Sequence, residues 1–193
     1  MADKKALIVL ACNATIAAEG DFLTKLLKKA ALFTDYTCGT VTDGFVEADL
    51  VTKAQPADLA GLIENGEALT VIDLGDADTT ALNQAFETIF DAVDRKTIIA
   101  VAGKGSLALY GNSVDGKAGN IARKANATDI VPTLAYVADF PITKDCIGGI
   151  LYQGLKSPNL KLDETTKLKE ALIRMESVIA RDNREPWDKH DCA

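Results

Sequence analysis

The sequence predicts a three-layer α/β/α fold, in which a mostly parallel sheet lies between two layers of helices. Short, continuous apolar runs at 6–11, 69–74 and 97–102 have the pattern of strands that are buried on both faces of such a sheet. Amphipathic stretches with helical spacing separate these runs. A chain of 193 residues, 48% of them apolar, is long enough to bury one core. We therefore expect a single domain over 1–193, with a C-terminal tail at 183–193.

The first half of the chain contains one distinct helix. Apolar side chains recur at helical spacing from Phe22 to Ala30 with lysines on the opposite side, and Asp21 is the predicted N-cap. The other elements of this half are a β-prone run at 37–41, an ambiguous stretch at 46–51, and a short helix at 56–64 that ends at Asn65 and Gly66.

The second half alternates strands and helices more regularly. We expect Asp78 to cap a helix that connects the strands 69–74 and 97–102 in a right-handed βαβ unit. The apolar positions of this helix are Leu82, Phe86, Ile89 and Val93. A tight turn at 103–106 then pairs the strand 97–102 with a short strand at 107–110. Glycines at 111, 116 and 119 indicate a loop after it.

Two further helices are predicted toward the C-terminus. Thr128 or Asp129 caps the first of them, and Pro132 falls in its first turn, where no backbone N–H is needed. The second begins after Asp163 and carries one apolar stripe, formed by Leu168, Leu172, Met175 and Ile179.

The charge balance excludes two classes of partner. The chain has 28 acidic and 21 basic residues, a formal net charge of −7. Affinity for nucleic acids and for anionic lipid surfaces comes largely from Lys and Arg, so we expect neither partner. No apolar run approaches the roughly 20 residues of a membrane-spanning helix.

The cysteines predict no metal or redox motif. They lie at positions 12, 38, 146 and 192 without CxxC spacing, and we expect them to be reduced and to serve as small apolar side chains. Lys4 to Cys12 is similar to a lipoprotein signal sequence. Its apolar run has only six residues, however, short of the roughly 7 to 15 of a signal peptide. The sequence therefore predicts a cytoplasmic protein.

The candidate site lies where the predicted strands end, because parallel sheets bind ligands beyond the carboxyl ends of their strands. Thr15 has the hydroxyl of a nucleophile, and the aspartates that follow the second strand have the oxygen ligands that Mg²⁺ prefers. Lys104 adds a cation for a small anionic ligand. The candidate ligand-binding residues are Asn13, Thr15, Asp73, Asp76, Lys104 and Ser106.

The same residues also have structural interpretations, which their types favour. Asn13 and Thr15 are typical of turns, and Asp78 is a helix cap beside which the other aspartates are solvated. The stretch 103–106 lacks the first glycine of a Walker A loop, and a hairpin explains it better. We therefore predict no catalytic residue, no metal and no cofactor.

Several segments between Leu69 and Leu155 resemble the alkaline phosphatase and sulfatase superfamily. Residues 128–136 are similar to the Asp-Ile-x-Pro-Thr start of a helix in that family, and 140–151 to the segment that follows it. Residues 110–116 are similar to its Gly-rich loop, and 97–105 to a strand that ends in Asp-His-Gly.

The resemblance implies an alkaline-phosphatase-like fold and a two-metal hydrolase of phosphate or sulfate esters. The chain departs from the family where metal ligands are required: Ala11, Cys12 and Asn13 replace the first aspartate, and Gly103 to Gly105 replace Asp-His-Gly. Its single histidine is His190. We therefore expect a non-catalytic module that binds a small molecule or a protein. The alternative is an ester hydrolase with a reduced site at the strand ends.

The short chain also predicts association. Members of the resembled family are generally longer, and we expect this chain to leave open, or to cover differently, the surfaces of the central domain that their additional segments cover. We expect a homo-oligomer or a complex with a partner protein, with Trp187 in the tail at the interface. The alternative is a monomer whose tail packs on its own domain.

Overall fold

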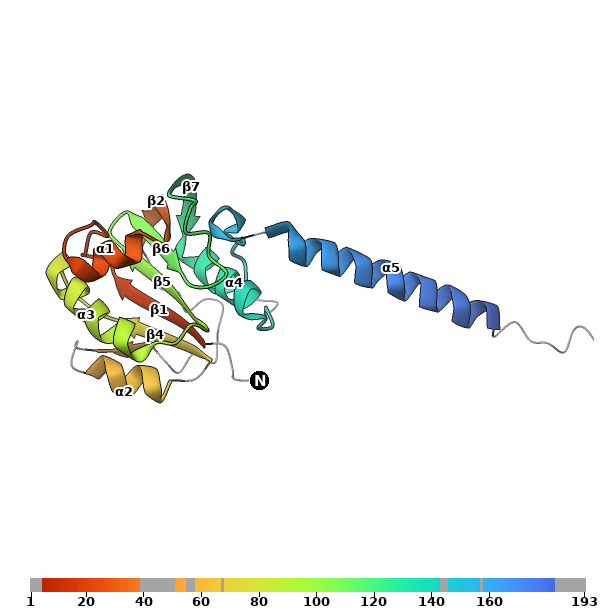
Figure 1. Ribbon diagram of the computed structural model, residues 1–193, viewed down its shortest axis with the longest axis horizontal. Helices are drawn as coiled ribbons and strands as arrows, with labels where there is room; N and C mark the ends of the chain where they lie inside the picture. The colour runs from red at the N-terminus through yellow and green to blue at the C-terminus, as the bar shows by residue number, and fades with distance from the viewer. Residues whose placement is uncertain are drawn as a thin grey trace, which may run out of the picture. The chain divides into compact units, whose positions relative to one another are not determined.

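The computed structural model describes residues 5–38, 51–54, 58–66, 68–142, 146–156 and 158–182. The chain divides into two compact units, Met1–Lys156 and Ser157–Ala193. The first contains the α/β fold and the second contains a single long helix in its described part (Figure 1). That the whole chain is one domain stays a prediction.

A seven-stranded sheet forms the centre of the first unit, with the strand order β3-β4-β1-β5-β6-β2-β7. All the strands run in one direction except β6, which pairs antiparallel with both of its neighbours. The predicted mostly parallel sheet is therefore confirmed. The strands are β1 (Lys5–Ala11), β2 (Ala31–Thr37), β3 (Val51–Lys53), β4 (Leu69–Asp73), β5 (Thr97–Gly103), β6 (Ser106–Tyr110) and β7 (Asn120–Asn126).

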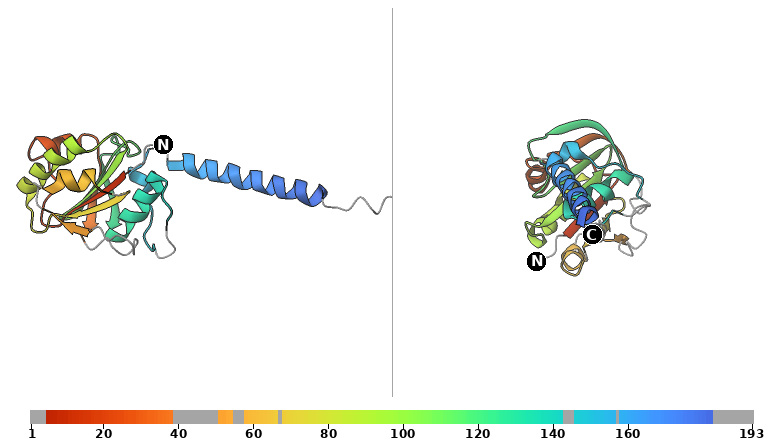
Figure 2. Two further views of the ribbon diagram at one scale, coloured as in Figure 1. Left: turned by 90° about the horizontal axis from the view of Figure 1, so that it is seen from below. Right: turned by 90° about the vertical axis from the view of Figure 1, so that its right-hand side faces the viewer.

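Helices cover both faces of this sheet, as the sequence predicts (Figures 1 and 2). One face carries α1 (Asp21–Leu27), α2 (Leu59–Glu64) and α3 (Thr79–Ala92), which pack on Leu7, Val9 and their neighbours. The other face carries α4 (Ala127–Ala138) and the turn η3 (Tyr152–Gly154), beside Ile8 and its neighbours. Adjacent residues of β1 thus enter opposite cores, which is why its sequence is apolar without interruption.

The second strand, β2, differs from the prediction. It occupies Ala31–Thr37, whereas a β-prone run was expected at 37–41, of which 39–41 lie outside the described residues. Three of its seven side chains are exposed, so the continuous apolar signal of a central strand is absent. The predicted stretch 46–51 and the start of the predicted helix 56–64 also lie largely outside the described residues, although α2 ends at Asn65 as expected.

The start of α1 shows a correction at the level of one residue. Asp21 is the first helical residue and Gly20 the N-cap, with no side-chain cap of its own. The cap comes instead from α3, because Asn83 Oδ1 accepts hydrogen bonds from the backbone N–H groups of Phe22 and Leu23, each at 3.1 Å. A residue 60 positions away in the sequence thus satisfies two donors that local sequence reasoning assigned to Asp21.

The start of α4 also differs from the prediction. Asn126 is the N-cap, and Asp129 forms a capping box with it by accepting a hydrogen bond from the Asn126 backbone N–H at 2.9 Å. Pro132 therefore lies inside the helix rather than in its first turn, and Thr128 O lacks the usual donor four residues later. The backbone of Gly148 packs against this oxygen so closely that a Cβ there would overlap it.

The second unit contains α5 (Pro158–Asp182), which begins before the predicted start at Asp163. The predicted stripe of Leu168, Leu172, Met175 and Ile179 is exposed along this helix. Trp187 and the predicted tail lie outside the described residues. Within the described ranges, no helix combines the length and apolar character needed to cross a bilayer.

Candidate functional site

The carboxyl end of the sheet brings together two of the residues that the sequence predicts as ligand-binding. Asn13 follows β1 and Asp76 follows the neighbouring strand β4. The Asn13 Nδ2 group donates a hydrogen bond to Asp76 Oδ1 at 3.0 Å. This contact joins the two loops beyond the strand ends, which the parallel pairing of β1 and β4 places side by side.

The other predicted residues after β1 and β4 have structural partners. The Thr15 N–H donates to Thr79 Oγ1 at 3.2 Å, which joins the loop after β1 to the start of α3. Asp73 Oδ1 accepts a hydrogen bond from the Gly75 N–H at 2.9 Å within a turn. Asp78 caps α3 through the Ala81 N–H at 2.8 Å, which confirms its predicted role.

Lys104 and Ser106 lie in the turn between β5 and β6. Gly103 pairs with Ser106 across this turn, and Gly105 has a positive φ of 71°, so the predicted hairpin is confirmed. The Lys104 backbone N–H donates to Ala14 O at 2.7 Å, whereas its side chain is exposed. That Lys104 and Ser106 bind a ligand, like Asn13 and the rest of the predicted site, stays a prediction.

The cysteines correct the sequence analysis. Cys12, directly after β1, and Cys38, directly after β2, form a disulfide. Their Cα atoms lie 5.7 Å apart, and their sequence separation is 26. The prediction of reduced, apolar thiols is wrong for this pair. Sequence spacing could not reveal it, because the loops that follow two non-neighbouring strands meet only in the folded chain. Across the described residues, no group of three or more His, Cys, Asp or Glu side chains forms a metal site.

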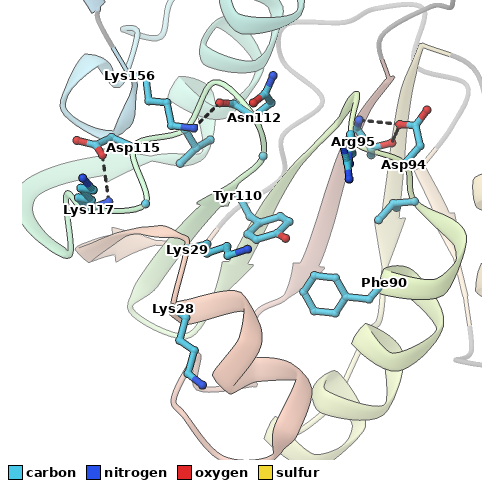
Figure 3. Close-up of a pocket in the computed structure, with 15 residues that line it drawn as sticks. Lys28, Lys29, Phe90, Asp94, Arg95, Tyr110, Asn112, Asp115, Lys117 and Lys156 are labelled. Atoms are coloured by element: carbon cyan, nitrogen blue, oxygen red, sulfur yellow. Dashed lines mark hydrogen bonds between the residues drawn. The ribbon is translucent and has the colours of Figure 1, made fainter.

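The opposite, amino end of the sheet carries a pocket that the sequence analysis did not predict (Figure 3). It has a volume of about 1270 Å³ and opens to solvent. Its walls are the end of α1, the segment from the end of α3 to the first residue of β5, and the loop after β6. We call it the amino-end pocket.

Positive charge dominates the amino-end pocket. Five cationic side chains and two carboxylates line it, which gives a local charge of 5 − 2 = +3. Within the described part of the chain, the side chains of Lys28, Lys29, Arg95 and Lys117 make no ion pair or hydrogen bond. The fifth cation, Lys156, donates a hydrogen bond from Nζ to Asn112 O at 2.7 Å. A cluster of cations without carboxylate partners favours an external anion.

Both carboxylates of the pocket are engaged with backbone N–H groups. Asp94 Oδ1 accepts hydrogen bonds from the N–H groups of Lys96 at 2.8 Å and Thr97 at 3.0 Å, and from Thr97 Oγ1 at 3.0 Å. These bonds, the Lys96 amide first and then the Thr97 hydroxyl, lower the pKa of Asp94 below its ordinary value. Asp115 Oδ1 accepts from the Lys117 N–H at 3.0 Å. Both carboxylates therefore stabilise the backbone of their own loops and do not pair with the lysine side chains of the pocket.

The floor of the pocket is aromatic. Phe90 of α3 and Tyr110 of β6 meet edge to face, with ring centroids 5.6 Å apart and an interplanar angle of 82°. Both rings are partly buried and lie between the lysine side chains on one side and Arg95 on the other (Figure 3). A flat apolar group can pack on them while an attached anion reaches the cations.

The loop after β6 is held in place on two sides. The Lys156 N–H donates to Ser113 O at 2.9 Å, and the Asp115 N–H donates to Gly154 O at 2.9 Å. On its other side, Gly116 approaches the backbone of Lys29, where a Cβ would lie 2.8 Å from the carbonyl oxygen. The loop that presents Lys117 is therefore packed against the protein rather than projecting from it.

Sequence reasoning missed this pocket because its residues come from four distant segments, the fourth being Lys156 alone. The available signal was the predicted hairpin: an antiparallel strand after the turn at 103–106 returns Tyr110 to the level of Ile99, near the start of β5. Arg95 precedes Thr97, and two lysines precede the start of β2 at the same end of the sheet. Without a prediction for β2, these lysines could not be placed there.

Comparisons with known proteins identify no relative: no family model, no curated protein and no solved structure matches this chain. The class defined by the fold is thus an α/β protein with a mostly parallel, doubly covered sheet.

Proposed function

We propose that this chain is a non-catalytic binding module for a small organic anion, and that the ligand occupies the amino-end pocket. The observation that carries the proposal is the charge of the pocket. A chain with a net charge of −7 gathers five cations there, and four of them have no partner among the described residues. The alkaline-phosphatase-like ancestry inferred from sequence motifs remains part of this proposal.

The chemistry of the pocket favours a ligand with two parts. Lysine ammonium and arginine guanidinium groups bind phosphate, sulfate or carboxylate oxygens through charge-assisted hydrogen bonds. Phe90 and Tyr110 offer ring surface for a flat, apolar part of the same molecule. A volume of about 1270 Å³ leaves room for both. A phosphorylated compound with an aromatic ring fits this description.

The carboxyl end of the sheet supports the non-catalytic part of the proposal. The carboxylates expected there accept hydrogen bonds from groups of the protein: Asp76 from the Asn13 side chain, and Asp73 and Asp78 from backbone N–H groups. The sequence also replaces the acidic and imidazole groups that the resembled hydrolases carry at these strand ends. Turnover of phosphate and sulfate esters with Mg²⁺, Mn²⁺ or Zn²⁺ that is lost in Thr15→Ala would favour the alternative hydrolase.

Isothermal titration calorimetry with adenosine monophosphate, ribose 5-phosphate and adenosine tests the binding proposal. We expect adenosine monophosphate to bind most tightly, because it alone combines the ring with the anion, and to bind less tightly at high salt. Lys29→Gln and Arg95→Gln should each weaken binding by about tenfold, the order of one charge-assisted hydrogen bond. Lys124→Gln, which removes an exposed cation of β7 outside the pocket, is the matched control.

Two results would contradict the proposal. One is the absence of binding of any of the three probes to the full chain. The other is a loss of affinity in Lys124→Gln that equals the loss in Arg95→Gln, because binding would then depend on overall charge rather than on the pocket.

A further inference from the structure

The Cys12–Cys38 disulfide connects two strands that are not neighbours. In the strand order, β5 and β6 lie between β1 and β2. The disulfide therefore joins the carboxyl ends of β1 and β2 on either side of the turn that connects β5 to β6. It lies at the end of the sheet opposite to the amino-end pocket.

Backbone hydrogen bonds hold the same turn independently of the disulfide. The Lys104 N–H donates to Ala14 O at 2.7 Å on the side of β1, and the Tyr36 N–H donates to Gly105 O at 3.3 Å on the side of β2. Gly103 packs tightly on the first of these loops, where a Cβ would lie 2.8 Å from Ala14 O. These contacts, together with the sheet ladders, remain when the disulfide is opened. The fold is thus compatible with both redox states.

The two sulfur-bearing residues differ in their access to solvent. Cys12 is exposed, whereas Cys38 is partly buried and packs against the core beneath α4. A thiolate from solvent can therefore reach the Cys12 side of the bond more readily than the Cys38 side. Exposed disulfides exchange with thiols, in contrast to the buried ones that only stabilise a fold.

We propose that Cys12 and Cys38 form a thiol–disulfide exchange site that takes small thiols and dithiols as its substrates. A thiolate of a dithiol attacks Cys12 Sγ, the bond between the two cysteines breaks, and Cys38 leaves as a thiolate that takes up a proton. The second thiolate of the dithiol then attacks the mixed disulfide and releases Cys12. Two electrons and two protons pass to the protein, and the dithiol becomes a disulfide.

This chemistry acts on the loop that carries the predicted carboxyl-end site. Asn13 follows Cys12 directly, and its side chain contacts Asp76. In the oxidised state the disulfide ties this loop to the end of β2, and in the reduced state that covalent tie is lost while the hydrogen bonds of Asn13, Ala14 and Thr15 remain. Reduction is thus expected to increase the mobility of the loop without unfolding the sheet.

Site-resolved alkylation with mass spectrometry, performed on the full chain purified without reductant, tests the proposal. In native buffer, iodoacetamide should label neither Cys12 nor Cys38 before treatment with dithiothreitol and should label both after it. Circular dichroism should show the same fold in both states. Removal of the dithiothreitol and addition of oxidised glutathione should restore the protection of both cysteines.

Two variants that each lack one cysteine of the pair test the assigned roles. With oxidised glutathione, Cys12 in the Cys38→Ser variant should form a mixed disulfide about tenfold faster than Cys38 in the Cys12→Ser variant, because access differs between the two positions. Cys146→Ser is the control and should leave the reduction rate of the pair unchanged. The proposal is overturned if the cysteines are alkylated without reductant, if dithiothreitol opens the pair only in denaturant, or if Cys38 reacts as fast as Cys12.

Discussion

Asp94 shows how one exposed side chain determines the start of a central strand. Its carboxylate accepts three hydrogen bonds from Lys96 and Thr97, immediately before β5 enters the sheet. Thr97 is buried, so its N–H and hydroxyl need partners within the protein. The same turn places Arg95 at the amino-end pocket, which links the stability of the strand start to the geometry of the proposed site.

We expect Asp94→Asn to lower the thermal midpoint at pH 7, because an amide oxygen is a weaker acceptor than a carboxylate. The hydrogen bonds lower the pKa of Asp94 in the folded state below 3.8, its ordinary value. The charged form therefore contributes stability above pH 3.8, and this contribution is lost as the pH falls through the lowered folded pKa. Melting curves of the wild-type and variant proteins, recorded at intervals of about one pH unit between about pH 2 and pH 7, check this expected loss of stability in acid. A difference in midpoint that stays constant into acid would contradict it.

At the scale of elements, the sequence predicts the strands that are buried on both faces of the sheet and misses the strands that are partly exposed. The sequences of β1, β4 and β5 are continuous apolar runs, a pattern that strands in the centre of a parallel sheet have. Their predicted positions are correct within about a residue. β7 (NIARKAN) pairs only with β2 and has one buried side chain, so its sequence resembles a loop. Strand partners rather than local preference define such edge strands.

The features of the candidate site also divide into those that the sequence predicts and those that it misses. The position of Asn13 and Asp76 beyond neighbouring strands is predictable from parallel pairing, whereas their hydrogen bond depends on loop geometry. The disulfide and the amino-end pocket require the full strand order, because each joins segments that only the antiparallel β6 and the unpredicted β2 bring together.

The cap that α3 provides for α1 gives a prediction at this scale. We expect Asn83→Ala to lower the free energy of unfolding by about 1 kcal/mol, the typical contribution of a helix cap, since two N–H groups of α1 lose their acceptor. Gln84→Ala, one position further along α3 at an exposed residue, is the matched control and should change the stability little. Urea denaturation measures both. Equal effects of the two substitutions would show that the hydrogen bonds of Asn83 to α1 add no stability of their own.

At the scale of the whole molecule, charge and apolar surface are unevenly distributed. The amino-end pocket carries an excess of cations in an acidic chain. Among the described side chains of α5, six large apolar ones are between 43% and 66% exposed, a surface that proteins commonly cover by association. Four of them, Leu168, Leu172, Met175 and Ile179, recur with steps of four, three and four residues, which is the spacing of a seam between paired helices.

We therefore expect the chain to self-associate through α5, with a second copy of the helix covering this seam. Sedimentation velocity at micromolar concentration should give a species larger than the monomer, and the double variant Leu172→Lys and Met175→Lys should shift it to the monomer by placing charges in the seam. Ile173→Lys is the matched control, because Ile173 is 64% exposed but lies off the seam, and it should leave the association unchanged. The α/β unit ends before α5, so circular dichroism should show an intact sheet in both variants. A wild-type chain that sediments only as a monomer would contradict this expectation, and equal dissociation by Ile173→Lys would place the contact on another face of the helix.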